Sequence, residues 1–330
     1  MRRKKNIALI YGGYSSEEII SRKSAEGILS FIEKDKYNVI PVLITKDRWV
    51  VTEGEEEWEI NKNLFNFKKG KKEIFFDCAY ITIHGSPGEN GFLQGYLEMA
   101  GVPYTTCNVL TSSLTFNKYV CNNYLKNFNV NVAEAVLITD NKEFCSKEIV
   151  AKTGLPCFVK PNAGGSSFGI SKVHNIEQLK WAIEKAFKES NQIVVEEFIE
   201  GKEVTCGLYK TAEKCEILPL TEIISKNEFF DFEAKYTPEK VTEITPARLN
   251  KEITNSIMSI SSNIYDILQC RGIIRIDYII KNNTIYMLEV NTTPGMTKTS
   301  FIPQQIKAKN LNIGNLFSEI IEDSIKNSKE

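Results

Sequence analysis

The sequence lacks any apolar run long enough to cross a membrane, and its charges almost cancel. Lysine and arginine number 41 and aspartate and glutamate 42, which leaves a formal net charge of -1. This balance excludes a general electrostatic attraction to nucleic acid or anionic lipid, so any binding of phosphate groups must be local. We therefore expect no nucleic-acid partner and no membrane association.

Signals for metal binding by cysteine and for secretion are also missing. The eight cysteines include no CxxC pair or other close spacing, and one of the two histidines, His174, has no motif around it. The N-terminal MRRKKN is basic, but the apolar stretch after it, residues 7–11, is too short for a signal peptide. These features predict a cytoplasmic protein whose thiols are reduced and mostly buried.

Short apolar runs alternate with helical patterns along the chain. The runs at 7–11, 38–44 and 79–83 are typical of buried strands, and residues 91–101 have helical spacing with Gly101 as the stop. Such an alternation predicts a mixture of α/β and α+β layers.

The second half continues the pattern and ends in two strong strands and a helix. A chain of 330 residues is long enough for two or three domains. We predict an N-terminal α/β domain over 1–106, a central subdomain over 107–195 and a C-terminal subdomain over 196–330.

The pattern with the most chemical content is a hairpin formed by IIRIDYII and TIYMLEVN, which the short connection KNN forces to be antiparallel. Side chains alternate between the faces of a strand. We expect one face to be core, with Ile274, Ile276, Tyr278, Ile280, Tyr286, Leu288 and Val290. If residue 277 pairs with residue 289, the other face gathers Arg275, Asp277, Glu289 and Asn291.

Two carboxylates and an amide beside a guanidinium are oxygen ligands of the kind that suit Mg²⁺. The alternative is an ordinary solvated face with an Arg–Asp ion pair, which is common on antiparallel sheets. The sequel NTTPGM favours the metal site, because a turn just beyond the ligands can present backbone N–H groups to an anion.

The stretch KPNAGGSSFG, residues 160–169, can cover a phosphate. Lys160 ends an apolar strand and offers a point charge, and the small residues after it expose backbone N–H groups. A simple hairpin turn would use the same residues. The lysine precedes the glycines, so this is not a Walker A loop, and no GxGxxG is present. Combined with the predicted metal face, the loop indicates half of a nucleotide site.

These motifs join others in a recognisable order: GGYSSE (12–17), HGSPGENGFLQG (84–95), NK (117–118), EFFDFEAKY (228–236), RID (275–277) and EVNTTPGMTKTSF (289–301). From about residue 6 to 325 the sequence resembles the D-alanine–D-alanine ligases of the ATP-grasp superfamily. The resemblance implies a three-domain ATP-grasp fold with an N-terminal parallel sheet, and a homodimer. It also implies ATP-dependent ligation for peptidoglycan synthesis, in which one D-alanine forms an acyl phosphate and the amine of a second displaces phosphate.

The resemblance also assigns nucleotide and metal roles. Asp277, Glu289 and Asn291 would hold two Mg²⁺ ions, replaceable by Mn²⁺, with Glu289 bridging them. Contacts to ATP would come from the phosphate-side residues Lys118, Lys160, Ser167 and Lys235 and the adenine- and ribose-side residues Glu196, Glu197, Phe198, Ile199 and Glu203.

The remaining roles that the resemblance implies concern the amino acids. Glu17 would hold the ammonium group of the first D-alanine and form a hydrogen-bonded triad with Ser166 and Tyr236 that couples recognition to loop closure. The other predicted residues are His84 near the acyl carboxylate, Arg275 and the Gly295 N–H as an oxyanion hole, and Ser300 with Phe301 at the second amino acid. Alone, a glutamate such as Glu17 is usually a helix-start charge, and a tyrosine such as Tyr236 usually packs. His84 alone could be a structural residue at a strand end.

Departures from the family pattern concern the nucleotide loop and the second substrate. Ala163 and Gly164 replace a common Arg–Glu pair, Phe230 and Phe232 stand where tyrosines are common, and Phe301 replaces a smaller aliphatic residue. Two other functions are a D-alanine–D-lactate ligase and a non-catalytic ATP-binding scaffold. The tyrosine of EAKY favours the dipeptide, and the retained metal and phosphate residues argue against a scaffold.

Overall fold

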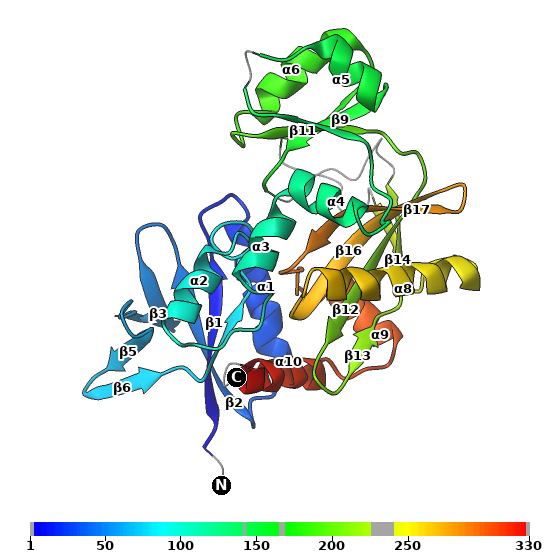
Figure 1. The fold of residues 1–330 in the computed structure, drawn as a ribbon. Coiled ribbons are helices and arrows are strands. Elements are labelled where there is room, and N and C mark those ends of the chain that lie inside the picture. Colours follow the sequence, from blue (N-terminus) through cyan, green and yellow to red (C-terminus); the bar gives the residue numbers. More distant parts are fainter. Residues whose placement is uncertain (1–2, 141–142, 165–168, 226–240, 328–330) are drawn as a thin grey trace.

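The computed structural model describes residues 3–140, 143–164, 169–225 and 241–327. The strands within these ranges form three main sheets and one small two-stranded sheet. Figure 1 shows the four-stranded sheet at the top, the N-terminal sheet at lower left and the largest sheet at lower right. Within the described ranges, no helix has both the length and the apolar character that crossing a membrane requires.

The first sheet has a parallel centre buried on both faces. Its elements are β1 (Lys5–Gly12), α1 (Glu18–Phe31), β2 (Tyr37–Ile44), β3 (Trp49–Glu53), β4 (Glu56–Glu59), β5 (Asn66–Lys69), β6 (Lys72–Phe75), β7 (Cys78–Ile81) and α2 (Phe92–Met99). The strand order is β4-β3-β2-β1-β7, with β1 parallel to β2 and β7. Ile7 and Leu9 face α1, whereas Ala8 and Ile10 face α2 and the β5-β6 hairpin. Burial on both faces explains the continuous apolar run in β1.

The second sheet is antiparallel, with the order β10-β9-β11-β8. Two helices lead into it and two cover one of its faces: α3 (Val109–Phe116), α4 (Lys118–Lys126), β8 (Ala135–Ile138), α5 (Ser146–Thr153), β9 (Cys157–Pro161), β10 (Ser171–Val173), α6 (Ile176–Ala186) and β11 (Ile193–Glu197). Cys157 and Val159 of β9 pack against α5 and α6. Phe158 and Lys160 therefore point to the opposite face.

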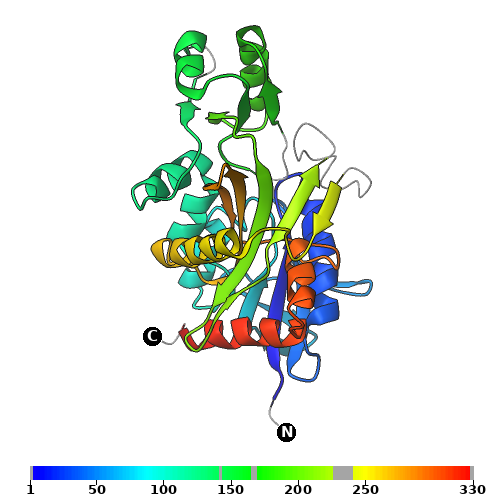
Figure 2. The ribbon, with the colours of Figure 1, turned by 90° about the vertical axis from the view of Figure 1, so that its right-hand side faces the viewer.

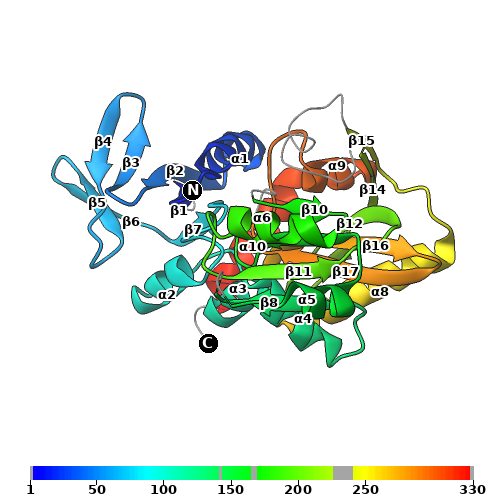
Figure 3. The ribbon, with the colours of Figure 1, turned by 90° about the horizontal axis from the view of Figure 1, so that it is seen from above.

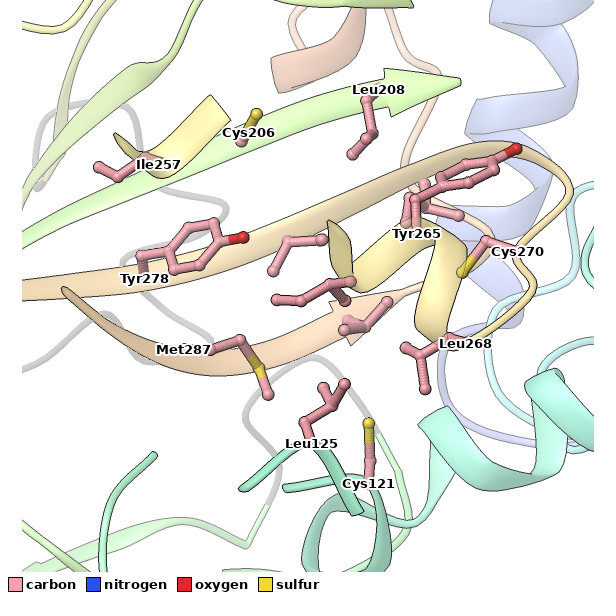
Figure 4. Close-up of a cluster of buried hydrophobic side chains, with 14 of the residues drawn as sticks. Cys121, Leu125, Cys206, Leu208, Ile257, Tyr265, Leu268, Cys270, Tyr278 and Met287 are labelled. Carbon is pink, nitrogen blue, oxygen red and sulfur yellow. The ribbon is translucent and has the colours of Figure 1, made fainter. Parts of the chain in front are cut away.

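The third sheet has the order β15-β14-β12-β16-β17, with β13 beside β12. Its elements are β12 (Lys202–Lys210), β13 (Cys215–Ile217), β14 (Thr221–Ser225), β15 (Val241–Ile244), α8 (Lys251–Ile267), β16 (Gly272–Lys281), β17 (Thr284–Asn291), α9 (Phe301–Ala308) and α10 (Ile313–Asn327). One face packs on α8 and α4 in the largest core cluster, where Figure 4 shows Tyr278 and Met287 between side chains of both helices.

The C-terminal helices join the first and third sheets into one core. Phe317 and Ile321 of α10 pack with Ile7 and Leu9 of β1, and the same cluster contains Tyr209 of β12. Figures 1 and 2 show α10, in red, along the bottom of the molecule. All eight cysteines are free, and all but Cys145 and Cys215 are buried, as the sequence predicts.

The predicted hairpin of β16 and β17 is confirmed, with a β-bulge that the sequence analysis did not foresee. Lys281 pairs with Thr284 across a two-residue turn, and this register alone would place Leu288 opposite Asp277. An extra residue in β17 shifts the register, so that Glu289 is the residue opposite Asp277. A bulge inserts one unpaired residue and re-aims the side chains beyond it.

The bulge corrects one prediction about the core. Met287 and Ile285, rather than Leu288 and Tyr286, occupy the buried face together with Val290. The predicted alternation was wrong on the turn side of the bulge, because a one-residue shift moves every following side chain to the other face. Leu288 instead reaches the open face of the sheet.

The start of β16 comes very close to the segment after β7. Gly272 has a φ of +65°, and a Cβ atom there would lie 1.9 Å from the Thr105 carbonyl oxygen. We expect Gly272→Ala to reduce the free energy of unfolding by more than about 3 kcal/mol, measured by urea denaturation. Gly54 is the matched control, because its φ is +63° and nothing lies within 4 Å of the added atom. Gly54→Ala should cost about 1 kcal/mol, and equal costs at the two sites would refute the close-contact explanation.

Candidate active site

The open faces of the second and third sheets and the first loops of the N-terminal sheet enclose one large cleft of about 1940 Å³. In Figures 1 and 3 the second sheet lies over β16 and β17. Every predicted site residue in the described ranges lines the cleft: Glu17, His84, Lys118, Lys160, Glu196, Glu197, Phe198, Ile199, Glu203, Arg275, Asp277, Glu289, Asn291, Gly295, Ser300 and Phe301. Ser166, Ser167, Lys235 and Tyr236, and the departures Phe230 and Phe232, lie outside the described residues.

Asp277 accepts four hydrogen bonds from the side chains around it. Its Oδ1 accepts from Thr205 Oγ1 at 2.5 Å and from Arg275 Nε at 2.9 Å. Its Oδ2 accepts from Arg275 Nη2 at 2.8 Å and from Asn291 Nδ2 at 3.1 Å. A carboxylate has about four lone-pair positions, so a cation bound to Asp277 must displace one of these donors.

The residues around Asp277 fit a magnesium ion. Glu289 lies directly opposite Asp277 in the hairpin, and its Oε2 is 3.5 Å from Lys118 Nζ. The side-chain N–H of Asn291 donates to Asp277, so the side-chain carbonyl oxygen of Asn291 points away from Asp277. The described residues hold no cluster of three or more His, Cys, Asp or Glu side chains placed for a metal. Two carboxylates and an amide leave coordination positions for phosphate oxygens and water, as Mg²⁺ prefers.

Arg275 is held as a cation at the centre of the cleft. Burial lowers its pKa, but the neighbouring charges of Asp277 and Glu289 outweigh this effect and raise the pKa above its usual range. The guanidinium also lies 5.5 Å from the ring centroid of Phe301, a distance typical of a cation–π contact. Phe301 thus packs on the face of Arg275, the proposed oxyanion-binding group. Phe301 is also the residue that replaces a smaller aliphatic side chain of the family.

The other wall of the cleft contains a buried ion pair with one unsatisfied oxygen. Lys160 Nζ lies 2.6 Å from Glu196 Oε2, and both side chains are largely buried. Glu196 Oε1 is buried without a hydrogen-bond partner among the described residues. Leaving such an atom unpaired is costly, so this oxygen is suited to accept an N–H group from a ligand. An adenine amine is a donor of the required kind.

Apolar and cationic groups line the same cleft as this oxygen. The rings of Phe158 and Phe198 meet edge to face at 5.7 Å, and Lys172 Nζ lies 4.0 Å from the Phe198 ring centroid. Ile279 and Leu288 line the cleft from the third sheet. Flat apolar surfaces on both sides are what a purine ring requires, and the bulge is what brings Leu288 to this face.

Asn162 holds Lys118 and Lys160, the two described lysines that are predicted to contact phosphate, in a fixed relation. Its side chain accepts from the Tyr119 N–H at 2.9 Å, and its carbonyl oxygen accepts from the Lys118 N–H at 3.0 Å. Lys118 Nζ donates to the Gly164 carbonyl at 2.6 Å. The start of α4 is therefore tied to the end of β9, which carries Lys160. The loop residue Gly164, which stands in place of a charged residue, meets Lys118 through its backbone.

His84 is buried and neutral. Burial and, to a smaller extent, the positive charge of Arg275 lower its pKa to about 4, and a hydrogen bond with the Thr293 backbone opposes the change. Its Nε2 lies 3.2 Å from Ser24 Oγ, which accepts from the Met296 N–H at 3.3 Å. His84 thus links α1 to the loop that carries Gly295.

The loop after β17 places the last predicted residues. Ser300 Oγ accepts from the Thr297 N–H at 3.0 Å and lies 2.8 Å from Thr297 Oγ1. A Cβ atom on Gly295 would lie 3.1 Å from the same Ser300 oxygen. Ser300 therefore fixes a tight turn beside Gly295, with both residues on the cleft wall.

The structure adds residues to the site that the sequence analysis missed. Thr205 is the cross-strand neighbour of Asp277 in β12, and Lys172 lies over the ring of Phe198 in the same cleft. Glu89 lines the cleft in the turn before α2, and its Oε2 accepts from the Gly85 N–H at 2.7 Å. Glu89 was present in the HGSPGENG motif, so a carboxylate in a glycine-rich turn was the available signal. The pairing of β12 with β16 had no signal in the sequence.

Comparisons with known proteins agree over nearly the whole chain. Residues 6–107 match the family model described as "D-ala D-ala ligase N-terminus", and residues 124–322 match "D-ala D-ala ligase C-terminus". The D-alanine–D-alanine ligase of Azobacteroides pseudotrichonymphae is 55% identical over 321 residues, which is 96% of this chain and 99% of the relative.

Solved structures are similar in fold. The VanG D-Ala:D-Ser ligase from Enterococcus faecalis is 31% identical with a TM-score of 0.87, covering 98% of this chain and 100% of that one. D-alanyl-alanine synthetase A from Vibrio cholerae is 28% identical with a TM-score of 0.88, covering 99% and 100%. The similarity therefore includes all three sheets that form the cleft.

Proposed function

The chain belongs to the D-alanine–D-alanine ligase family, and on that premise we propose how its cleft joins two D-alanine molecules. The fold is an ATP-grasp fold, and the activity is ATP-dependent ligation to D-alanyl-D-alanine, ADP and phosphate for peptidoglycan synthesis. The observation that carries the residue roles is the convergence of all the described motif residues on one cleft.

The first step joins two anions. The D-alanine carboxylate attacks the γ-phosphate of ATP, and like charges repel unless cations are placed between them. Lys118 and Lys160 enter from α4 and β9, on different walls of the cleft. Mg²⁺ held by Asp277, Glu289 and Asn291 would supply further positive charge at the phosphates. The orphan oxygen of Glu196 and the rings of Phe158 and Phe198 would hold the adenine.

The second step places negative charge on the acyl oxygen. The neutral amine of the second D-alanine adds to the acyl phosphate, and as the peptide bond forms phosphate leaves and the nitrogen loses one proton. The guanidinium of Arg275 and the N–H of Gly295 would stabilise the oxyanion. His84, being neutral and bonded to Ser24, acts on the position of the Gly295 loop. Ser300 and Phe301 would contact the second amino acid, and enclosure of the cleft protects the acyl phosphate from water.

Further features of the proposal rest on family membership and on sequence. They are two bound metal ions, with Mn²⁺ able to replace Mg²⁺, a homodimer, a cytoplasmic location and the three-domain division at residues 106 and 195. The triad of Glu17, Ser166 and Tyr236 also belongs to the proposal. Glu17, the described member, is nearly buried at the start of α1.

The proposal predicts the choice of second substrate. ADP and phosphate should form with D-alanine alone, at a rate that added D-lactate or D-serine does not increase by more than about twofold. Both products and the dipeptide would be measured at neutral pH by coupled assay and chromatography. D-Serine is included because the VanG relative is named for it. Turnover only in the presence of D-lactate or D-serine would contradict D-alanyl-D-alanine as the product. Absence of ADP formation under every condition would contradict ligase activity.

A further inference from the structure

Glu89 has no role in the mechanism above, although its side chain faces the cleft. Its Oε2 accepts from the Gly85 N–H at 2.7 Å, and its own N–H donates to the Gly85 carbonyl at 2.8 Å. Glu89 is half-buried. This double contact fixes the carboxylate in the wall of the cleft instead of leaving it to rotate into solvent.

Glu17 contacts the same glycine. Glu17 is 7% exposed, and a Cβ atom on Gly85 would lie 3.0 Å from its Oε2 and 2.9 Å from Ser15 Oγ. The φ of Gly85 is +71°, so both the backbone angle and the lack of space require glycine. Gly85 therefore brings two carboxylates, from the start of α1 and from the turn after β7, to one point of the cleft.

The groups that face Glu89 come from several elements. They are Glu17 at α1, Lys118 on α4, Arg275 on β16 and Thr293 in the loop after β17, with neutral His84 at the start of the same turn. Burial and the negative charge of Glu17 raise the pKa of Glu89 to about 7, against the opposing effects of Gly85, Thr293 and Lys118. Glu89 is therefore partly protonated at neutral pH.

We propose that Glu89 and Glu17 together form the binding site for the ammonium group of the first D-alanine, and that ammonium binding releases a proton from Glu89 to solvent. The inference rests on the proposed function, which supplies a substrate with an ammonium group. In the balance, Glu89 changes from carboxylic acid to carboxylate, the ammonium keeps its protons, and the released proton passes to the buffer. The pocket thus keeps the same total charge before and after binding.

The consequence is selection of an amino acid over a hydroxy acid at the first position. A hydroxy acid has no positive charge with which to stabilise the second carboxylate, so Glu89 would stay protonated. A ligand cation placed between two desolvated carboxylates is favourable, whereas a neutral group in the same place leaves their mutual repulsion in force. Glu89 is accordingly a substrate-binding residue in addition to Glu17.

The test is a proton count by isothermal titration calorimetry. D-Alanine is titrated into the enzyme saturated with ADP and Mg²⁺, in two buffers with different ionisation enthalpies. Because the pKa of Glu89 is about 7, the wild type should release roughly three quarters of a proton at the first site near pH 6.5. Near pH 8.5 it should release almost none. At higher pH Glu89 has already lost its proton before D-alanine binds. The affinity for D-alanine should therefore rise with pH up to about 7 and then level off.

Two variants complete the test. Glu89→Gln keeps an acceptor for the Gly85 N–H, so it should fold, release no proton and bind D-alanine roughly tenfold more weakly near pH 8.5. Glu26→Gln is the control, because Glu26 is an exposed carboxylate lining the same cleft and should behave like the wild type.

The outcomes separate this inference from the function itself. Wild-type enzyme that makes the dipeptide but releases no proton at either pH, or Glu89→Gln that releases the same fraction as the wild type, overturns the role of Glu89 alone. Wild-type enzyme that neither binds D-alanine nor forms ADP overturns the proposed function. The wild-type measurement needs no variant, so misfolding of Glu89→Gln would not remove the test.

Discussion

Replacing Glu289 with glutamine should lower kcat by a factor on the order of 10³ or more, with little change in thermal stability. Glu289 lies opposite Asp277 and 3.5 Å from Lys118 Nζ, so its charge serves both the metal and the phosphate-side lysine. Glutamine has nearly the same shape but no charge. The loss should therefore appear in catalysis and in the Mg²⁺ concentration required, measured by ADP release over a range of Mg²⁺.

A matched control separates the metal role from the loss of an ordinary ion pair. Glu319 on α10 pairs with Lys214 at 3.1 Å and lies away from the cleft. Glu319→Gln removes a carboxylate of similar exposure and should leave kcat within about twofold. Full activity in Glu289→Gln at ordinary Mg²⁺ concentration would contradict the metal assignment.

Replacing Arg275 with lysine should lower kcat by about 10² to 10³ even though the positive charge is kept. Arg275 binds both oxygens of Asp277 through Nε and Nη2, and its flat face packs on Phe301. Lysine has a single ammonium group and cannot make the fork or the stacked contact. The expected result is a lower kcat with an unchanged KM for ATP, measured by the same assay.

Arg248 offers the same kind of contact without the proposed role. It binds Glu222 through Nε at 2.9 Å and Nη2 at 3.0 Å. Arg248→Lys breaks an equivalent fork, so it should affect stability more than kcat. If the two lysine variants lose kcat equally, the loss at Arg275 reflects a broken ion pair and not the stabilisation of an oxyanion.

The hairpin illustrates what sequence patterns can predict. Alternation and short connections predicted the β16-β17 pair, and the chemistry of Asp277, Glu289 and Asn291 pointed to a shared face that the structure confirms. The bulge at Leu288 could not be predicted, because the sequence is equally compatible with a regular strand and with a strand that contains one extra residue. The wrong placement of Tyr286 and Leu288 follows from that single insertion.

Contacts between distant segments were also beyond sequence reasoning. Thr205 meets Asp277 only because β12 pairs with β16, and α10 packs on β1 although roughly 300 residues separate them. The role proposed for Glu89 depends on the approach of Glu17 to Gly85, which no local sequence pattern indicates. The resemblance to a family gave residue identities in advance, whereas burial, pairing and charge environment required the fold.

The most direct test of the central claim, ligation through an acyl phosphate, is an oxygen-transfer measurement. D-Alanine labelled with ¹⁸O in its carboxylate is incubated with the enzyme, ATP and Mg²⁺, and the phosphate released is analysed by mass spectrometry. Because the carboxylate oxygen attacks the γ-phosphate, about one ¹⁸O atom should appear in phosphate for each dipeptide formed. Dipeptide formation with unlabelled phosphate would contradict the mechanism.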